Sequence, residues 1–135
     1  MMEKNFEDRG QKIVVAAKGI ETSTGAFLND IYREFLPEER LAYISGPSFA
    51  AEVKQSLPTA LMFSSTNMDL AQTYADALPK FIKGYVDTDV VGAEVSGAYK
   101  NVIAIAGGVS DGFGLGNNAR AALISRGLVE MTRFG

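Results

Sequence analysis

The chain has 135 residues, a net charge of -3 and neither cysteine nor histidine, and 47% of its residues are hydrophobic and 21% charged. These values are typical of one compact globular domain, and the acidic balance, without a run of Lys or Arg, argues against a nucleic-acid binder. The absence of His and Cys excludes Ser-His-Asp and Cys-His nucleophiles and most zinc sites, which leaves Lys, Asp, Glu and Tyr as acid-base groups. We therefore expect neither a nucleic-acid partner nor a metal.

The sequence also lacks the signals of membrane insertion. The apolar run Val102–Ala106 is far shorter than the roughly 20 residues that a membrane-spanning helix needs. Residues 1–10 are polar and charged, unlike the apolar segment of a signal peptide. We therefore expect a soluble chain without a membrane span.

The first two thirds of the chain alternate short apolar runs with amphipathic segments. Gln11–Ala17 is rich in β-branched residues, as in a strand buried on both faces of a parallel sheet. A helix follows, which we expect to be capped by Thr22, Ser23 or Thr24 and to stop before Pro37. Further along, the patterns predict strands over 41–44, 59–64 and 81–86 and helices over 48–54 and 68–78. The alternation indicates an α/β fold.

From Asp89 onward the pattern is helical. It predicts helices over 90–106 and 118–134, joined by the glycine-rich link 107–116. Because this link joins two helices and does not follow a strand, we interpret it as a connection and not as a phosphate-binding loop. We place an architectural boundary near Asp87, with an α/β part over residues 1–87 and a helical part over residues 88–135.

The predicted helix over 90–106 has two different faces. One stripe has the spacing of a core-facing surface and comprises Val95, Tyr99, Val102, Ala106 and Val109. The opposite face carries Ala93, Gly97, Ala104 and Gly107, with Lys100 and Asn101 set among them. Each glycine costs a helix about 1 kcal/mol relative to Ala. This face therefore either lets a ligand approach Lys100 closely or forms a tight helix-helix contact, and the periodicity favours neither.

Residues 45–50 leave the second predicted strand through a Ser-Gly-Pro-Ser sequence. Pro47 suits the first turn of a short helix from Ser48 to Lys54, because that position needs no N–H. Free N–H groups at the end of a strand are a place where open α/β sheets bind anionic or polar ligands. The local pattern is also typical of an ordinary turn, which is the more frequent outcome.

Both ends of the sequence suggest a piece of a longer protein. The helical periodicity continues to Arg133-Phe134-Gly135, and no glycine-rich nucleotide-binding turn precedes the strand over 11–17. We therefore expect the chain to be a fragment. Without that turn, we also expect it to bind a nucleotide cofactor poorly and to be inactive by itself.

Four stretches follow one another in a characteristic order and spacing: Ala17–Glu21, Ser45–Ala50, Gly97–Ile105 and Asp111–Met131. Together they resemble the motifs of the NAD(P)-dependent glycerol-3-phosphate dehydrogenases and extend over nearly the whole chain. The resemblance implies the C-terminal part of a Rossmann-type parallel-sheet domain, followed by the start of an all-helical substrate domain. It also implies interconversion of sn-glycerol 3-phosphate and dihydroxyacetone phosphate with NAD or NADP.

The resemblance also implies roles for individual residues. Lys100 matches the catalytic lysine, which contacts the substrate as well. The other matched positions are Lys18 at substrate and cofactor, Gly46 and Ser48 at the substrate, Ala50 at the cofactor, and Asn101 beside the catalytic lysine. When hydride adds to the ketone carbon, the Lys100 ammonium can stabilise the charge on oxygen and deliver a proton. We expect that amine to face an open crevice bordered by Gly and Ala, within reach of Lys18.

The sequence departs from the family pattern at Tyr99, where Leu is usual, and we expect altered packing there with intact chemistry. The nearest alternative is a β-hydroxyacid dehydrogenase or a ketopantoate reductase. In β-hydroxyacid dehydrogenases an Asn stands four residues after the lysine, whereas in this chain that position is occupied by Ala104. A non-catalytic helical interaction module is the alternative from another class. For the intact protein we expect a phosphorylated triose or glycerol substrate, a homodimer, and a cytoplasmic location, with an organelle as the alternative.

Overall fold

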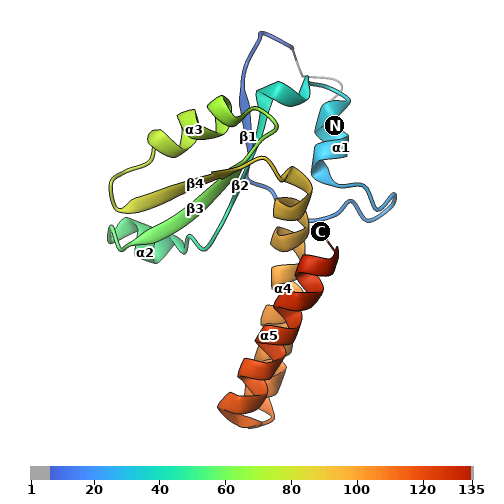
Figure 1. The fold of residues 1–135 in the computed structure, drawn as a ribbon, viewed down its shortest axis with the longest axis vertical. Helices are drawn as coiled ribbons and strands as arrows, with labels where there is room; N and C mark the ends of the chain where they lie inside the picture. Colours follow the sequence, from blue (N-terminus) through green and yellow to red (C-terminus); the bar gives the residue numbers. More distant parts are fainter. Residues whose placement is uncertain (1–6, 135) are drawn as a thin grey trace.

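The structure of the chain is a computed structural model that describes residues 7–134. A four-stranded sheet carries helices on its faces, and a long helical hairpin projects away from it (Figure 1). In chain order the elements are β1 (Ile13–Val15), α1 (Leu28–Arg33), the 3-10 turn η1 (Glu38–Arg40), β2 (Leu41–Ser45), α2 (Ala50–Lys54), β3 (Thr59–Ser64), α3 (Met68–Asp76), β4 (Ile82–Asp87), α4 (Val90–Gly112) and α5 (Gly116–Phe134).

The α/β class is confirmed, but the sheet is mixed, which corrects the expectation of a parallel sheet. Its order is β1-β2-β3-β4. The pairs β1–β2 and β3–β4 are parallel, whereas β2 and β3 are antiparallel, with Ile44 opposite Phe63. A parallel return needs a crossover connection along the sheet. The segment between β2 and β3 contains only the five-residue α2, so the chain re-enters the sheet at the end where β2 leaves it.

Two apolar layers cover the sheet, one on each face (Figure 1). The first packs β1 and β2 against α1 and the start of α4 and is built from Val15, Leu36, Leu41, Tyr43 and Val90. The second packs the sheet against α3 and is built from Phe63, Ala71 and Ala75. Since Val90 is the first residue of α4, the first layer anchors that helix to the sheet.

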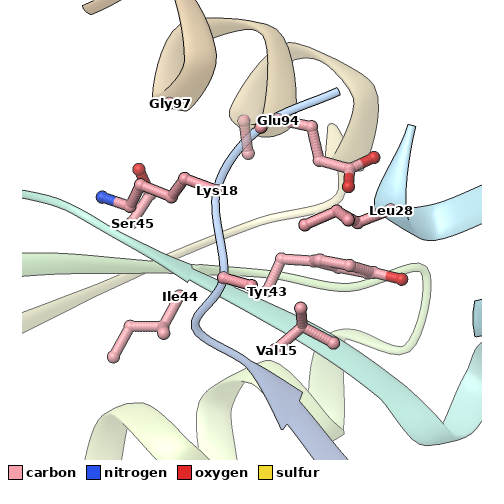
Figure 2. A pocket seen from close by; sticks show the side chains of 11 residues that line it. Val15, Lys18, Leu28, Tyr43, Ile44, Ser45, Glu94 and Gly97 are labelled. Carbon is pink, nitrogen blue, oxygen red and sulfur yellow. The ribbon is translucent and has the colours of Figure 1, made fainter. Parts of the chain in front are cut away.

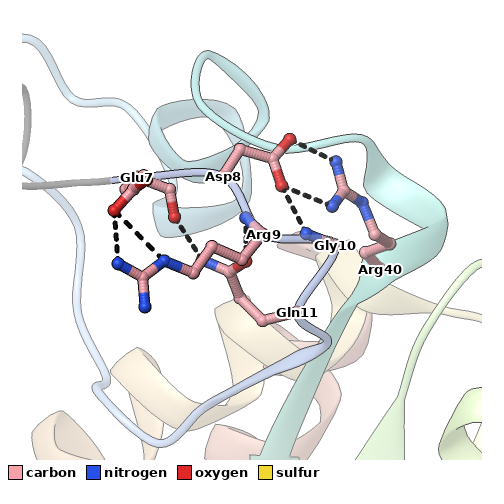
Figure 3. Close-up of polar contacts among 6 residues, drawn as sticks. All are labelled: Glu7, Asp8, Arg9, Gly10, Gln11 and Arg40. Carbon is pink, nitrogen blue, oxygen red and sulfur yellow. Dashed lines mark hydrogen bonds and ion pairs between the residues drawn. The ribbon is translucent and has the colours of Figure 1, made fainter.

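A bidentate ion pair holds the segment before β1. Asp8 accepts hydrogen bonds from Nη1 and Nη2 of Arg40 at 2.7 and 2.8 Å (Figure 3). Hydrogen bonding to Arg40 is the main reason why the pKa of the exposed Asp8 carboxyl falls from 3.8 to about 2. Because Arg40 directly precedes β2, the pair brings the segment before β1 beside the strand with which β1 pairs.

Three local expectations were wrong in detail. The expected caps Thr22, Ser23 and Thr24 do not begin α1, which starts at Leu28. Instead, the Glu21 carboxylate accepts hydrogen bonds from the N–H and hydroxyl groups of Ser23 and Thr24. The helix expected from Ser48 begins at Ala50, because Phe49 still has extended backbone angles. The strand expected over 11–17 is limited to the three residues that pair with Leu41–Tyr43.

The hairpin differs from the expectation at its turn and on its core face. Gly107 and Gly108, expected in the link, lie inside α4, and the chain reverses over residues 113–115. Val95 is buried, but Val102 and Val109, from the same predicted stripe, are 56% and 52% exposed. The reason is that the early turns of α4 lie on the sheet, whereas the later turns face α5 and solvent (Figure 1). Within residues 7–134, no helix combines the length and apolar character needed to cross a bilayer.

Candidate active site

Lys18 lies where the sheet meets α4. It follows β1, and its aliphatic stem passes beneath Gly97 and beside Ser45 (Figure 2). A Cβ placed on Gly97 would stand 3.6 Å from Cδ of Lys18 and 3.9 Å from Oγ of Ser45. The glycine therefore lets the helix lie directly over the lysine stem. We call this meeting place of residues 17–19, Ser45 and the first turns of α4 the junction.

Lys100 brings a second positive charge to the junction. Lys18 is an exposed residue, and its pKa is lowered, first by the partial desolvation of its amine and then by the positive charge of Lys100. A second lysine whose positive charge reaches Lys18 makes this region attractive to an anion. Lys18 contacts the helix at Gly97, and Lys100 lies three residues further along α4, so the fold brings two lysines that are far apart in sequence to one region.

Lys100 also borders an open groove between α4 and α5. Its neighbours in that groove on α4 include Ala104, Gly107 and Gly108, and Ile124 and Leu128 lie opposite on α5. A Cβ added at Gly107 or Gly108 would meet no atom within 4 Å among the described residues. The small residues beside the lysine thus leave room for another group to approach α4.

The turn after β2 holds the other expected site residues. Gly46 has a φ of +132°, and a Cβ there would stand 2.7 Å from the carbonyl oxygen of Ala60. Only glycine fits without strain, so this residue has a structural reason to be present. Ser48 and Ala50 follow on the exposed surface and line neither the pocket around Lys18 nor the groove at Lys100. Asn101 is exposed on α4, next to Lys100.

Two residues of the junction escaped the sequence analysis. Ser45 lies at the end of β2 and lines the same pocket as Lys18. Glu94 is only 9% exposed on α4 and accepts a hydrogen bond from the N–H of Asn29 at 3.0 Å. Burial is the main cause that raises the pKa of Glu94. Glu94 could have been noticed in the sequence as a single acidic residue between the apolar Ala93 and Val95. Ser45 gave no such signal, because it resembled part of a turn.

Tyr99, the departure from the family pattern, joins the two helices of the hairpin. Its hydroxyl donates to Oε2 of Glu130 at 2.9 Å, and Oε1 of the same carboxylate accepts from Nε of Arg126 at 3.0 Å. The hydrogen bond to Glu130 is the main cause that raises the pKa of Tyr99. A Leu could not make this contact, so Tyr99 adds a polar link between α4 and α5 directly beside Lys100.

Solved structures place the fold among the glycerol-3-phosphate dehydrogenases. The crystal structure of the enzyme from Coxiella burnetii matches 94% of this chain with a TM-score of 0.84 and 38% identity, over 39% of its own length. A Plasmodium falciparum glycerol-3-phosphate dehydrogenase matches 99% of the chain with a TM-score of 0.86, over 38% of its own length; at 22% identity it supports the fold alone. The Rossmann-type α/β unit followed by helices is thereby confirmed.

Sequence comparisons identify the family. Residues 2–71 match the family described as NAD-dependent glycerol-3-phosphate dehydrogenase N-terminus, and residues 89–135 match the description of its C-terminus. The chain belongs to the NAD-dependent glycerol-3-phosphate dehydrogenase family, which confirms the resemblance. The NAD(P)+ glycerol-3-phosphate dehydrogenase of Campylobacter jejuni is 60% identical over 99% of the chain, and that of Sulfurimonas denitrificans is 58% identical over the same share. The chain spans 45% of the length of each of these relatives.

Proposed function

We propose that this protein interconverts sn-glycerol 3-phosphate and dihydroxyacetone phosphate by hydride transfer, with NAD or NADP as the hydride carrier. The observation that carries the proposal is the position of the Lys18 stem beneath Gly97, one turn of α4 before Lys100, so that both lysines serve the junction. A phosphate ester with two negative charges is a ligand that would relieve the repulsion between two ammonium groups. Relatives that are 58–60% identical to the chain are glycerol-3-phosphate dehydrogenases, which supports the same substrate class.

In this proposal Lys100 is the catalytic residue. The nicotinamide cofactor, when bound, supplies or accepts the hydride. During reduction, the C=O electron pair moves onto oxygen as the ketone carbon gains hydride, and the Lys100 ammonium stabilises that charge and donates a proton to it. In the reverse direction the neutral amine of Lys100 accepts the proton of the hydroxyl group. Substrate binding is also assigned to Lys100, since the donor must lie within hydrogen-bond reach of the oxygen.

The remaining residues are assigned to binding. Lys18 would serve both the substrate phosphate and the cofactor, because its amine carries the second charge at the junction. Gly46 and Ser48 would contact the substrate, and the backbone of Ala50 would contact the cofactor, since all three follow the strand end next to Ser45. Asn101 would support Lys100 from the next position on α4.

The same proposal extends to the organisation of the protein. Residues 1–87 would belong to a Rossmann-like nucleotide-binding domain, and residues 88–135 would begin a helical substrate and catalytic domain. The change from β4 to α4 between Asp87 and Val90 supports this division. We further propose a homodimer in the cytoplasm as the working form, as the family resemblance implies.

Replacement of Lys100 by Ala in the full-length enzyme tests the proposed activity. We expect the turnover of dihydroxyacetone phosphate to fall by at least about 10²-fold, because the proton donor is lost. The melting temperature should stay within a few degrees of the original, since the side chain is exposed. Nicotinamide absorbance measures the turnover, and Lys80→Ala, which removes an exposed lysine on the connection between α3 and β4, is the control.

Three outcomes of these assays would contradict the proposal. Activity confined to a 3-hydroxy acid or to ketopantoate would move the protein to a neighbouring dehydrogenase class. Unchanged turnover of dihydroxyacetone phosphate in Lys100→Ala would remove Lys100 from the chemistry. No turnover of any of these substrates by the unmodified protein would favour a non-catalytic helical module.

A further inference from the structure

Glu94 makes a polar contact between helices that are far apart in sequence. Its side chain leaves α4 toward Leu28, the first residue of α1 (Figure 2). There Oε1 accepts the N–H of Asn29 at 3.0 Å. Phe27, which precedes α1, has no side-chain oxygen that could accept this N–H. Glu94 thus satisfies a helix-end donor of α1 from a different element.

The contact continues into the sheet. Oδ1 of Asn29 accepts a hydrogen bond from the hydroxyl of Tyr43 at 3.0 Å, and all three residues are buried. Glu94, Asn29 and Tyr43 therefore form one buried polar chain from α4 through α1 to β2. We call it the Glu94 chain.

Packing alone does not explain a carboxyl group at this position. Oε2 of Glu94 is buried and has no hydrogen-bond partner among the described residues. Burial with one unpaired oxygen costs free energy that an apolar side chain of similar size would avoid. The charge of Asp30 on α1 disfavours the ionised form further, whereas the backbone N–H groups of Asn29 and Leu28 favour it, and burial is the larger effect. A buried carboxyl group that destabilises the fold, beside the junction, suggests that Glu94 positions the residues of the site.

The location of Glu94 on α4 gives it control over Lys100. Apart from Ser110, the buried residues of α4 lie between Val90 and Gly97, so this short segment sets the angle of the helix on the sheet. Lys100 lies six residues beyond Glu94, or about 9 Å along the helix axis. A tilt of roughly 10° at Glu94 would move Lys100 by about 1.6 Å, and misplacements of about 1 Å can cost a catalyst about 10²-fold.

We propose that Glu94 is a positioning residue of the reaction: the Glu94 chain fixes the angle of α4 on the sheet and thereby holds Lys100 opposite Lys18. The inference rests on the proposed dehydrogenase function. Glu94 itself does not touch the substrate. Its contribution is the orientation of the helix that carries the proton donor.

The test measures kcat and KM of the full-length enzyme for Glu94→Met and Glu94→Gln at a temperature where both are folded. Met fills a similar volume without an acceptor, so we expect kcat to fall about 10-fold or more, with KM for the cofactor within about 2-fold. Gln keeps an oxygen that can accept the Asn29 N–H, so we expect kcat within about 3-fold of the original. Ser110→Ala is the matched control, because Ser110 is a buried, unpartnered polar residue on the same helix.

A purely structural role predicts a different pattern. It would lower the melting temperature of Glu94→Met but leave kcat per folded molecule unchanged, and this result would overturn the inference. If Glu94→Met does not fold, Glu94→Asp replaces it. The shorter side chain can reach Asn29 only if α4 shifts, so unchanged kcat in Glu94→Asp would also overturn the inference.

The failures of the two proposals are distinguishable. If the unmodified enzyme is active, Lys100→Ala is inactive and Glu94→Met keeps its kcat, only the Glu94 inference fails. If the unmodified enzyme turns over no dihydroxyacetone phosphate, the proposed function fails and the inference fails with it.

Discussion

The two halves of α4 form one continuous helix but lie in different surroundings. From Val90 to Gly97 the helix packs on the sheet and on α1, and five of its residues there are buried. Beyond Lys100 it packs against α5, and Val102 and Ile105 are 56% and 70% exposed. Lys100 lies where the anchored half gives way to the projecting half. This lysine therefore takes its position from the anchored half and borders the open groove of the projecting half.

The polar contacts of the two halves differ in the same way. The anchored half holds the buried Glu94 and covers the stem of Lys18 through Gly97. The projecting half makes exposed pairs with α5, such as Asp111 with Arg120. Exposed ion pairs contribute little to stability, typically below about 1 kcal/mol. The orientation of Lys100 therefore depends mainly on the anchored half, and the part-buried hydrogen bond from Tyr99 to Glu130 is the contact with α5 beside it.

The same truncation on the two halves should give the largest contrast in stability. Val95 is 2% exposed, so we expect Val95→Ala to lower the free energy of unfolding of this chain by about 2 kcal/mol. Val102 is more than half exposed, so Val102→Ala should change it by less than about 0.5 kcal/mol. Urea denaturation measures both. Equal losses of stability at the two positions would mean that Val102 is buried in solution. They would contradict the difference between the anchored and the projecting half.

Glycine replacements should sharpen the contrast with smaller effects. A Cβ at Gly107 on α4 would meet no neighbouring atom of residues 7–134, so Gly107→Ala should stabilise the chain by about 1 kcal/mol, because alanine has the better helix propensity. Gly46 borders the junction with a φ of +132° and no room for a Cβ. Gly46→Ala should therefore destabilise the chain by at least about 1 kcal/mol. Thermal unfolding monitored by circular dichroism gives both values, and the same sign at both positions would contradict the structural difference.

Strands with continuous apolar runs could be predicted closely from the sequence. The predicted strand over 59–64 agrees with β3, and the prediction over 41–44 falls one residue short of β2. The direction of β3 was not predicted, because a continuous apolar run reports burial on both faces, and in this mixed sheet an antiparallel strand is buried in that way too. The expected caps of α1 failed because the Glu21 carboxylate competes for the hydroxyl and N–H groups of Ser23 and Thr24.

The site depended on contacts between distant parts of the chain. The sequence periodicity correctly predicted a face of small residues on α4. It also predicted that Val102 and Val109 are part of the core, but both are more than half exposed. Proximity of Lys18 to Lys100 was expected from the family resemblance, since local patterns do not report on residues more than eighty positions apart. Glu94 was missed because its function depends on Asn29 and Tyr43, and no local motif connects the three residues.

The central claim is that Lys18 and Lys100 converge at the junction, and the pKa of Lys18 tests it most directly. A positive charge nearby disfavours protonation, so the account predicts a Lys18 pKa below 10.5 in the unmodified chain. In Lys100→Met that pKa should rise toward 10.5, while burial keeps part of the depression. An NMR titration of the Lys18 side chain provides the measurement, with Lys80→Met, remote on the α3–β4 connection, as the control. A Lys18 pKa that is unchanged by Lys100→Met would contradict the account.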